Sequence, residues 1–131
     1  MDAFQTPGAF SWNELMTSDP EAALAFYSAL LGWNSSRMPM PGGDYHVVKV
    51  GETAVGGVMA MPPEARAGGM PPSWGSYVTV ADVDATARRA ADLGGKVVHG
   101  PHDIPGVGRM AVIVDPQGAA INVIAYAMPA G

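Results

Sequence analysis

The sequence predicts an α+β fold in which two copies of a βαβββ module pair into a curved mixed sheet around a cavity. Two observations predict it. The same order of elements occurs twice along the 131 residues, and in each half an aspartate heads the helix and a glycine follows it. Two sheets that each carry one helix bury their apolar faces best as one continuous sheet, whose concave face suits a ligand.

The length and composition agree with one globular domain. Domains most often contain roughly 100–150 residues. A chain with 48% hydrophobic and 15% charged residues has the composition of a folded protein and not of a disordered one. We divide the domain into a first module over residues 8–62, a linker over 63–72 and a second module over 73–127.

The first module opens with a strand over residues 9–17, followed by a helix. Asp19 can cap this helix with Pro20 at its first position, and Glu21 then lies near the positive end of the helix dipole. Apolar residues recur at helical spacing until Gly32, which ends the helix. Glycine turns separate three further strands, predicted over 34–38, 44–50 and 53–61.

The second module repeats this order after a segment rich in proline, glycine and alanine. That segment, 62–72, is typical of a linker or an exposed loop. A strand is predicted over 76–80, and a helix over 83–93 begins after Asp82 and ends at Gly94-Gly95. The remaining elements are strands over 96–99, 109–114 and 119–126, a loop with two prolines over 100–108 and a tight turn over 115–118.

The charge and residue usage exclude several classes of protein. The seven Lys and Arg residues are scattered along a chain of net charge −5, so no basic stripe for a nucleic acid is present. No apolar run approaches the roughly 20 residues that span a bilayer, and residues 1–6 lack the apolar core of a signal peptide. The absence of cysteine excludes disulfides and thiolate chemistry. We expect a cytoplasmic protein with no nucleic-acid or membrane partner.

Short motifs in both halves carry a resemblance to a known superfamily. They are residues 12–23, Phe26-Tyr27, Leu31-Gly32-Trp33, Ser73-Trp74, Tyr77-Val78, Asp82-Val83-Asp84, Leu93-Gly94-Gly95, 103–109 and 115–119. Over residues 9–126 the chain resembles the vicinal oxygen chelate superfamily, which includes glyoxalase I, bleomycin-resistance proteins and extradiol dioxygenases. The resemblance implies their common fold. It implies little about activity, because this scaffold hosts many chemistries.

The resemblance also implies where a metal ion would bind. Metal-dependent members place four ligands, mostly histidine and glutamate, on the first and last strands of each module. Here these positions fall on Trp12, Gly75, Asn122 and either Gly56 or Gly57. Tryptophan and glycine side chains do not bind a divalent ion, and one asparagine oxygen is a poor site. We therefore expect no metal and no other cofactor, with an unusual divalent site that includes Glu14 and Asn122 as the alternative.

The histidines do not replace these ligands. His99 and His102 have the spacing of a chelating pair on a helix turn, but Pro101 lies between them and disfavours a helix. We expect both, like His46, to be ordinary surface or half-buried histidines.

Glu14 and Tyr77 are the candidate catalytic residues. Glu14 lies two positions after Trp12, so both share one face of a strand. A carboxylate in an apolar pocket has a raised pKa and can act as a general acid or base, or it can hold a cationic or hydroxylated ligand. A partner across the module interface that satisfies Glu14 is the structural alternative. Tyr77 is its counterpart in the second half, where core packing is the alternative.

Five other residues are candidate ligand contacts. Trp12, Met59 and Met110 supply apolar walls, and methionine adapts to different ligand shapes. Asn122 adds an amide, and Arg109 an anion contact at the cavity mouth unless it is simply exposed.

Two functions of different classes stay open. In the first, the chain binds a small apolar or amphipathic molecule without metal, as in the bleomycin-resistance branch. In the second, it is a lyase, isomerase or dioxygenase-type enzyme that uses Glu14 for proton transfer or in an unusual metal site. We also expect a homodimer, because superfamily members often form two-fold dimers and isologous dimers are the commonest oligomers.

Overall fold

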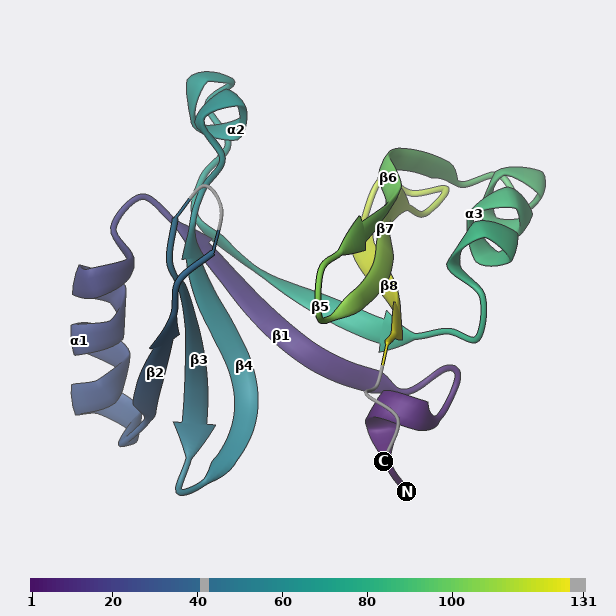
Figure 1. Ribbon diagram of the computed structural model, residues 1–131. Helices are drawn as coiled ribbons and strands as arrows, with labels where there is room; N and C mark the ends of the chain where they lie inside the picture. Colours follow the sequence, from purple (N-terminus) through teal and green to yellow (C-terminus); the bar gives the residue numbers. More distant parts are fainter. Residues whose placement is uncertain (41–42, 128–131) are drawn as a thin grey trace. The chain divides into compact units, whose positions relative to one another are not determined.

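The computed structural model of the chain describes residues 1–40 and 43–127 (Figure 1). The chain folds into two compact units, which we name after the helix that each contains. The α1 unit comprises Trp12–Gly75 and contains α1, Pro20–Leu31. The α3 unit comprises residues 1–11 together with those from Ser76 onwards and contains α3, Val83–Asp92.

The strands of the α1 unit follow the predicted order. Their order in the sheet is β2-β3-β4-β1, with β1 and β4 parallel and the other neighbours antiparallel. This mixed arrangement confirms the first βαβββ module. The strands are β1 (Phe10–Thr17), β2 (Asn34–Met38), β3 (Tyr45–Val50) and β4 (Thr53–Ala60).

The α3 unit repeats the same topology. Its strand order is β5-β8-β7-β6, with the pair β5 and β8 parallel. Its strands are β5 (Ser73–Thr79), β6 (Lys96–Ile104), β7 (Gly108–Val114) and β8 (Ala120–Tyr126). A short 3-10 helix, Ala3–Gln5, joins this unit, because the Thr79 hydroxyl donates to the Ala3 carbonyl at 2.7 Å. The predicted α+β class with two related modules is therefore confirmed.

The residues predicted to begin and end the helices do so in the structure. The Asp19 carboxylate accepts the Ala22 N–H at 3.1 Å, and the Asp82 carboxylate accepts the Ala85 N–H at 3.0 Å. Both helices therefore begin with the same aspartate cap. Gly32 ends α1 in the left-handed region at φ 75°. In the second half Gly94, the first residue of the predicted Gly94-Gly95 stop, follows the end of α3 at φ 92°.

Two segments differ from the prediction of irregular structure. The prediction of a loop over 100–108 is wrong for the first half of that segment, because β6 continues through Ile104. Pro101 is tolerated there because β6 is the last strand in the order of its unit and its register against β7 shifts at this point. The segment 62–72 contains a five-residue helix, α2 (Pro63–Ala67).

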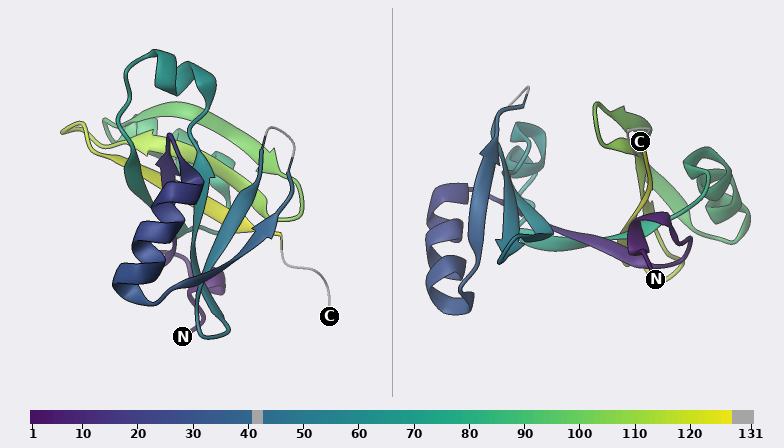
Figure 2. Two further views of the ribbon diagram at one scale, coloured as in Figure 1. Left: turned by 90° about the vertical axis from the view of Figure 1, so that its left-hand side faces the viewer. Right: turned by 60° about the horizontal axis from the view of Figure 1, so that its bottom comes forward.

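Each helix covers one face of the sheet in its own unit (Figure 1 and Figure 2). Leu15, Val48 and Val58 form the buried cluster against α1, and Val83, Ala111, Ile113 and Val123 form the cluster that includes α3. Because strand residues alternate between faces, Glu14 and Tyr77 lie on the faces turned away from the helices. Among the described residues, no helix is long and apolar enough to cross a membrane.

Candidate functional site

Glu14 is held by a short chain of hydrogen bonds on the face of the α1 unit's sheet that is turned away from α1. The Tyr45 hydroxyl donates to Oε2 of Glu14 at 2.8 Å. The indole Nε1–H of Trp12 donates in turn to the Tyr45 hydroxyl oxygen at 2.9 Å. All three residues are half-buried. The phenol therefore uses both its donor and its acceptor capacity, and it orients the carboxylate.

Gly57 makes the contact between Tyr45 and Glu14 possible. β4 lies between β1 and β3, and Gly57 is the register partner of Glu14 on one side and of Val47 on the other. The Tyr45 side chain crosses β4 at this point, so a Cβ atom on Gly57 would overlap its ring and hydroxyl. A glycine inside a strand is typical of such a close approach.

Gly56 serves the sheet itself. A Cβ atom there would lie 2.6 Å from the backbone oxygen of Asn13 on β1. The two consecutive glycines therefore have different structural roles. Gly56 lets the parallel strands β1 and β4 approach each other, and Gly57 leaves room for the Tyr45 side chain.

Methionines flank the carboxylate. Met16 and Met59 are direct register partners across β1 and β4, and Tyr45 is the partner of Met59 across β3 and β4. Strand alternation places both methionines on the face of Glu14, and both are half-buried. The predicted residues Trp12, Glu14 and Met59 thus share one face, where a polar group stands among apolar side chains.

The strand register decides which glycine takes the fourth metal position. Gly57 pairs with Glu14 in the α1 unit as Asn122 pairs with Tyr77 in the α3 unit. The space above Gly57 is filled by the Tyr45 ring. Trp12, Gly57, Gly75 and Asn122 offer no carboxylate or imidazole, so these residues do not fit the metal that the family implies. Among the described residues, no three His, Asp or Glu side chains are grouped as a metal site.

Three of the predicted residues gather on the face of the α3 unit's sheet that is turned away from α3. Tyr77 and Asn122 are register partners, and Met110 pairs with Ile124, two positions along β8. Tyr77 and Met110 are buried. The Asn122 amide donates to the Ser76 carbonyl at 3.3 Å.

Arg109 lies elsewhere, on the α3 side of its sheet. Its guanidinium binds both carboxylate oxygens of Asp84, at 2.8 and 3.0 Å, and one oxygen of Asp103 at 3.1 Å. The bond from Arg109 lowers the pKa of Asp84, and the pKa of Arg109 is raised by the same partners. Two carboxylates already pair with this cation, so Arg109 is not part of the proposed ligand-binding face.

Tyr45 is the site residue that sequence reasoning missed. It lies 31 residues from Glu14 in the sequence, so no local motif joins the two. The available signal was indirect: Gly56-Gly57 inside an otherwise regular strand indicates that something approaches the backbone closely.

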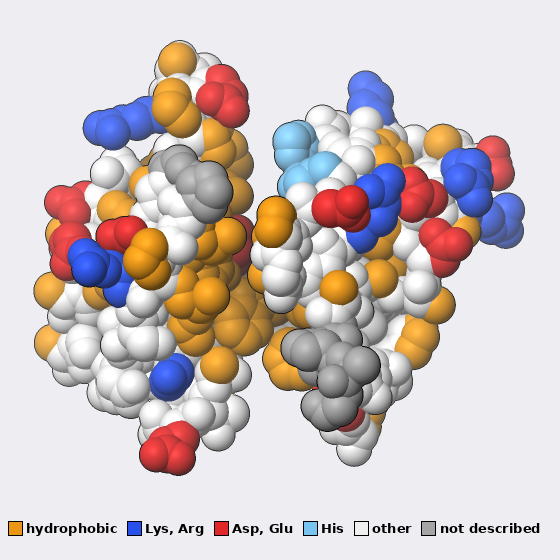
Figure 3. Space-filling view, viewed as in Figure 1, with side chains coloured by type: hydrophobic (Ala, Val, Ile, Leu, Met, Phe, Trp, Pro, Cys, Tyr) orange, Lys and Arg blue, Asp and Glu red, His pale blue; other side chains and the backbone are white. Residues whose placement is uncertain are grey.

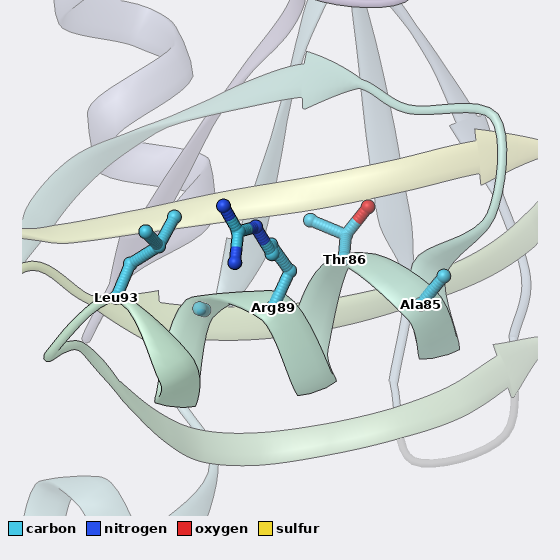
Figure 4. A pocket seen from close by; sticks show the side chains of 5 residues that line it. Ala85, Thr86, Arg89 and Leu93 are labelled. Atoms are coloured by element: carbon cyan, nitrogen blue, oxygen red, sulfur yellow. The ribbon is translucent and has the colours of Figure 1, made fainter.

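Two hollows lie outside this face. One, of about 400 Å³, runs along α3 and is lined by residues of that helix and its end (Figure 4). The other, of about 320 Å³, lies in the α1 unit, where the Trp33 and Trp74 rings meet edge to face. The Trp74 indole there donates to the Tyr27 hydroxyl at 3.1 Å. Neither hollow is lined by Glu14 or Tyr45.

Solved structures share this fold. A methylmalonyl-CoA epimerase from Mycobacterium tuberculosis superposes with a TM-score of 0.68 at 20% identity, covering 92% of this chain and 89% of that one. A Streptomyces coelicolor methylmalonyl-CoA epimerase in complex with 2-nitronate-propionyl-CoA gives a TM-score of 0.68 at 17% identity, covering 96% and 99%. At these identities the likeness concerns the fold alone.

Curated relatives are more similar in sequence. The chain is 48% identical over 118 residues to "Putative glyoxylase CFP32" of Mycobacterium tuberculosis, covering 89% of this chain and 44% of that protein. It is 35% identical over 128 residues to "Anthracycline biosynthesis protein DnrV" of Streptomyces peucetius, covering 89% and 46%. The chain thus spans somewhat less than half the length of these relatives. The family model described as Glyoxalase/Bleomycin resistance protein/Dioxygenase superfamily matches residues 9–123, and the chain belongs to that superfamily.

Proposed function

We propose that the chain binds a small amphipathic molecule, without a metal ion, on the sheet face that carries Trp12, Glu14 and Tyr45. The observation that carries this proposal is the hydrogen-bond chain from Trp12 through Tyr45 to Glu14. A carboxylate oriented in advance loses little freedom when a ligand arrives, which favours binding.

The chemistry of this face selects the kind of ligand. An ionised carboxylate only accepts hydrogen bonds, so it suits a hydroxyl or an ammonium group. Met16, Met59 and the Trp12 ring offer apolar and polarisable surface beside it. A flat, largely apolar molecule with a hydroxyl or amine at its edge combines both requirements.

The name of one relative supports the same class of ligand. DnrV is named for anthracycline biosynthesis, and an anthracycline is a flat fused-ring molecule with hydroxyl groups. We therefore choose a daunorubicin-type anthracycline, which also carries an amino sugar, as the probe for this chain.

Proton transfer is the second candidate function. CFP32 has the name of a glyoxylase, and Glu14 is a carboxylate whose position is set by a phenol. A general base must lie within hydrogen-bond reach of the proton that it removes. In this second candidate function, Glu14 takes a proton from a bound substrate, and Tyr45 holds the carboxylate in place.

Replacement of Glu14 distinguishes the candidates. We expect the anthracycline to bind the wild-type chain in a fluorescence titration. Loss of a charge-assisted hydrogen bond in Glu14→Gln should weaken binding roughly tenfold or more. Glu21→Gln, at the exposed start of α1, is the matched control and should bind as the wild type does.

In parallel, turnover is measured with one substrate, the hemithioacetal that methylglyoxal forms with a thiol. Binding that persists in Glu14→Gln while turnover disappears would favour the enzyme. Binding that is equal in wild type and Glu14→Gln, with no turnover in either, would contradict both candidates.

A further inference from the structure

Two histidines lie together on β6, in the part of the chain that the Glu14 face does not include. The ring centroids of His99 and His102 are 4.7 Å apart, with the ring planes at 71°. His99 is exposed and His102 is half-buried. Histidine side chains are visible side by side on the surface in Figure 3.

A bulge in β6 brings the two rings together. Residues three apart in a regular strand point to opposite faces. Here His99 pairs with Val112 and His102 with Met110, so three steps along β6 match two steps along β7. The extra residue, in the Gly100-Pro101 segment, turns both histidines to one side. The strand thus provides the neighbouring pair that the sequence suggested only for a helix turn.

One nitrogen of this pair lacks a partner. Nδ1 of His102 is buried and has no hydrogen-bond partner among the described residues. A buried polar atom without a partner calls for an explanation, and a bound ion or water molecule is one such explanation.

The distance between the two rings is compatible with one shared metal ion. Metal–nitrogen bonds of about 2.0–2.1 Å put two imidazole nitrogens on one ion at a separation of roughly 3–3.5 Å. Rings with centroids 4.7 Å apart can present nitrogens at that separation. Imidazole is a good ligand for zinc, copper and nickel.

We propose that His99 and His102 bind a divalent transition-metal ion, with water or an external ligand at its remaining positions. Asp103 is adjacent, but its carboxylate accepts a bond from Arg109 at 3.1 Å, so the two imidazoles are the donor set. With two protein ligands the ion is exchangeable, in contrast to the closed four-ligand sites that stabilise folds. This site is separate from the strand positions at which metal-dependent members of the superfamily bind their ion.

The test uses Ni²⁺ alone and the full chain. Calorimetric titration should give one site, and His99→Gln and His102→Gln should each weaken it at least about tenfold, since even outer-shell partners of metal ligands cost that much. Lys96→Gln, also on β6, is the matched control and should bind as the wild type does. Because His99 is exposed, His99→Gln should fold, and it decides the matter if His102→Gln does not.

A second measurement locates the ion. Substoichiometric Cu²⁺ should broaden the NMR signals of His99 and His102 first and leave those of His46, which is buried in the α1 unit, unchanged. Equal Ni²⁺ affinity in wild type and His99→Gln, or broadening that begins elsewhere, would overturn the proposal.

Discussion

Because Gly57 has no side chain, Tyr45 can reach across β4 and contact Glu14. The phenol passes over β4 because nothing stands at Gly57, and it reaches Glu14 on the strand beyond. The contact of Tyr45 with Glu14 therefore depends on the absence of a side chain at Gly57, which makes Gly57 part of the proposed site without chemistry of its own.

We predict that Gly57→Ala destabilises the protein by about 1–3 kcal/mol, the typical cost of overpacking. The added methyl group would displace the Tyr45 ring and break its bond to Glu14. Urea unfolding measures the loss. In a Tyr45→Ala background the methyl group has room, so the same substitution should cost much less. An equal cost in both backgrounds would mean that Tyr45 does not occupy this space.

At the scale of elements, α3 is tied to the β6–β7 hairpin by the Arg109 guanidinium, which bridges Asp84 and Asp103. The pKa of Asp84 is lowered, chiefly by its hydrogen bond from Arg109. A lowered pKa in the folded state contributes stability that is present above the ordinary carboxyl pKa and is lost as pH falls through the folded value.

We predict that Arg109→Gln returns the Asp84 pKa to its ordinary range and reduces the acid-dependent loss of stability. NMR titration of the Asp84 carboxyl carbon and unfolding at pH 7 and pH 3 measure the two effects. Arg89→Gln, exposed on the same helix, should leave the Asp84 pKa unchanged. An unaltered Asp84 pKa in Arg109→Gln would show that the ion pair does not form in solution.

The elements were predictable where their signals are local. Asp19 and Asp82 cap helices through residues three positions away, and Gly32 ends α1 through its own backbone. The extension of β6 was not predictable in this way, because tolerance of Pro101 depends on the place of β6 in the sheet order. Glu14 and Trp12 could be assigned to one face from the sequence, because they lie two residues apart in one strand. Their link through Tyr45 could not be predicted, because it depends on how β3, β4 and β1 pair.

At the scale of the whole molecule, α1 presents an uncharged apolar surface. Phe26, Leu30 and Leu31 are all more than half exposed, and no charged residue follows Glu21 in this helix. The helix in the other half, α3, carries Arg88 and Arg89 on exposed positions. A face at a two-fold axis meets its own copy, so the lack of charge avoids repulsion between like groups. The homodimer expected from the sequence stays a prediction, and we place a second copy of the chain on α1.

We predict that the wild-type chain has about twice the monomer mass in light scattering at micromolar concentration. Leu30→Lys should yield monomers, because it brings two like charges together across the axis. Ala85→Lys, an exposed position on α3, should leave the dimer intact. A monomeric wild type, or a dimer that Leu30→Lys does not disturb, would contradict this assignment.

The most direct test of the ligand-binding face is a methyl NMR spectrum of ¹³C-methyl-methionine-labelled protein, titrated with the anthracycline. The proposal predicts that the signals of Met16 and Met59, which flank Glu14, shift with the ligand. Those of Met1 and Met70, which are 97% and 47% exposed and lie outside the strands of this sheet, should not move. Shifts confined to Met1 or Met70, or no shift at any methionine, would contradict the claim that this sheet face is the binding site.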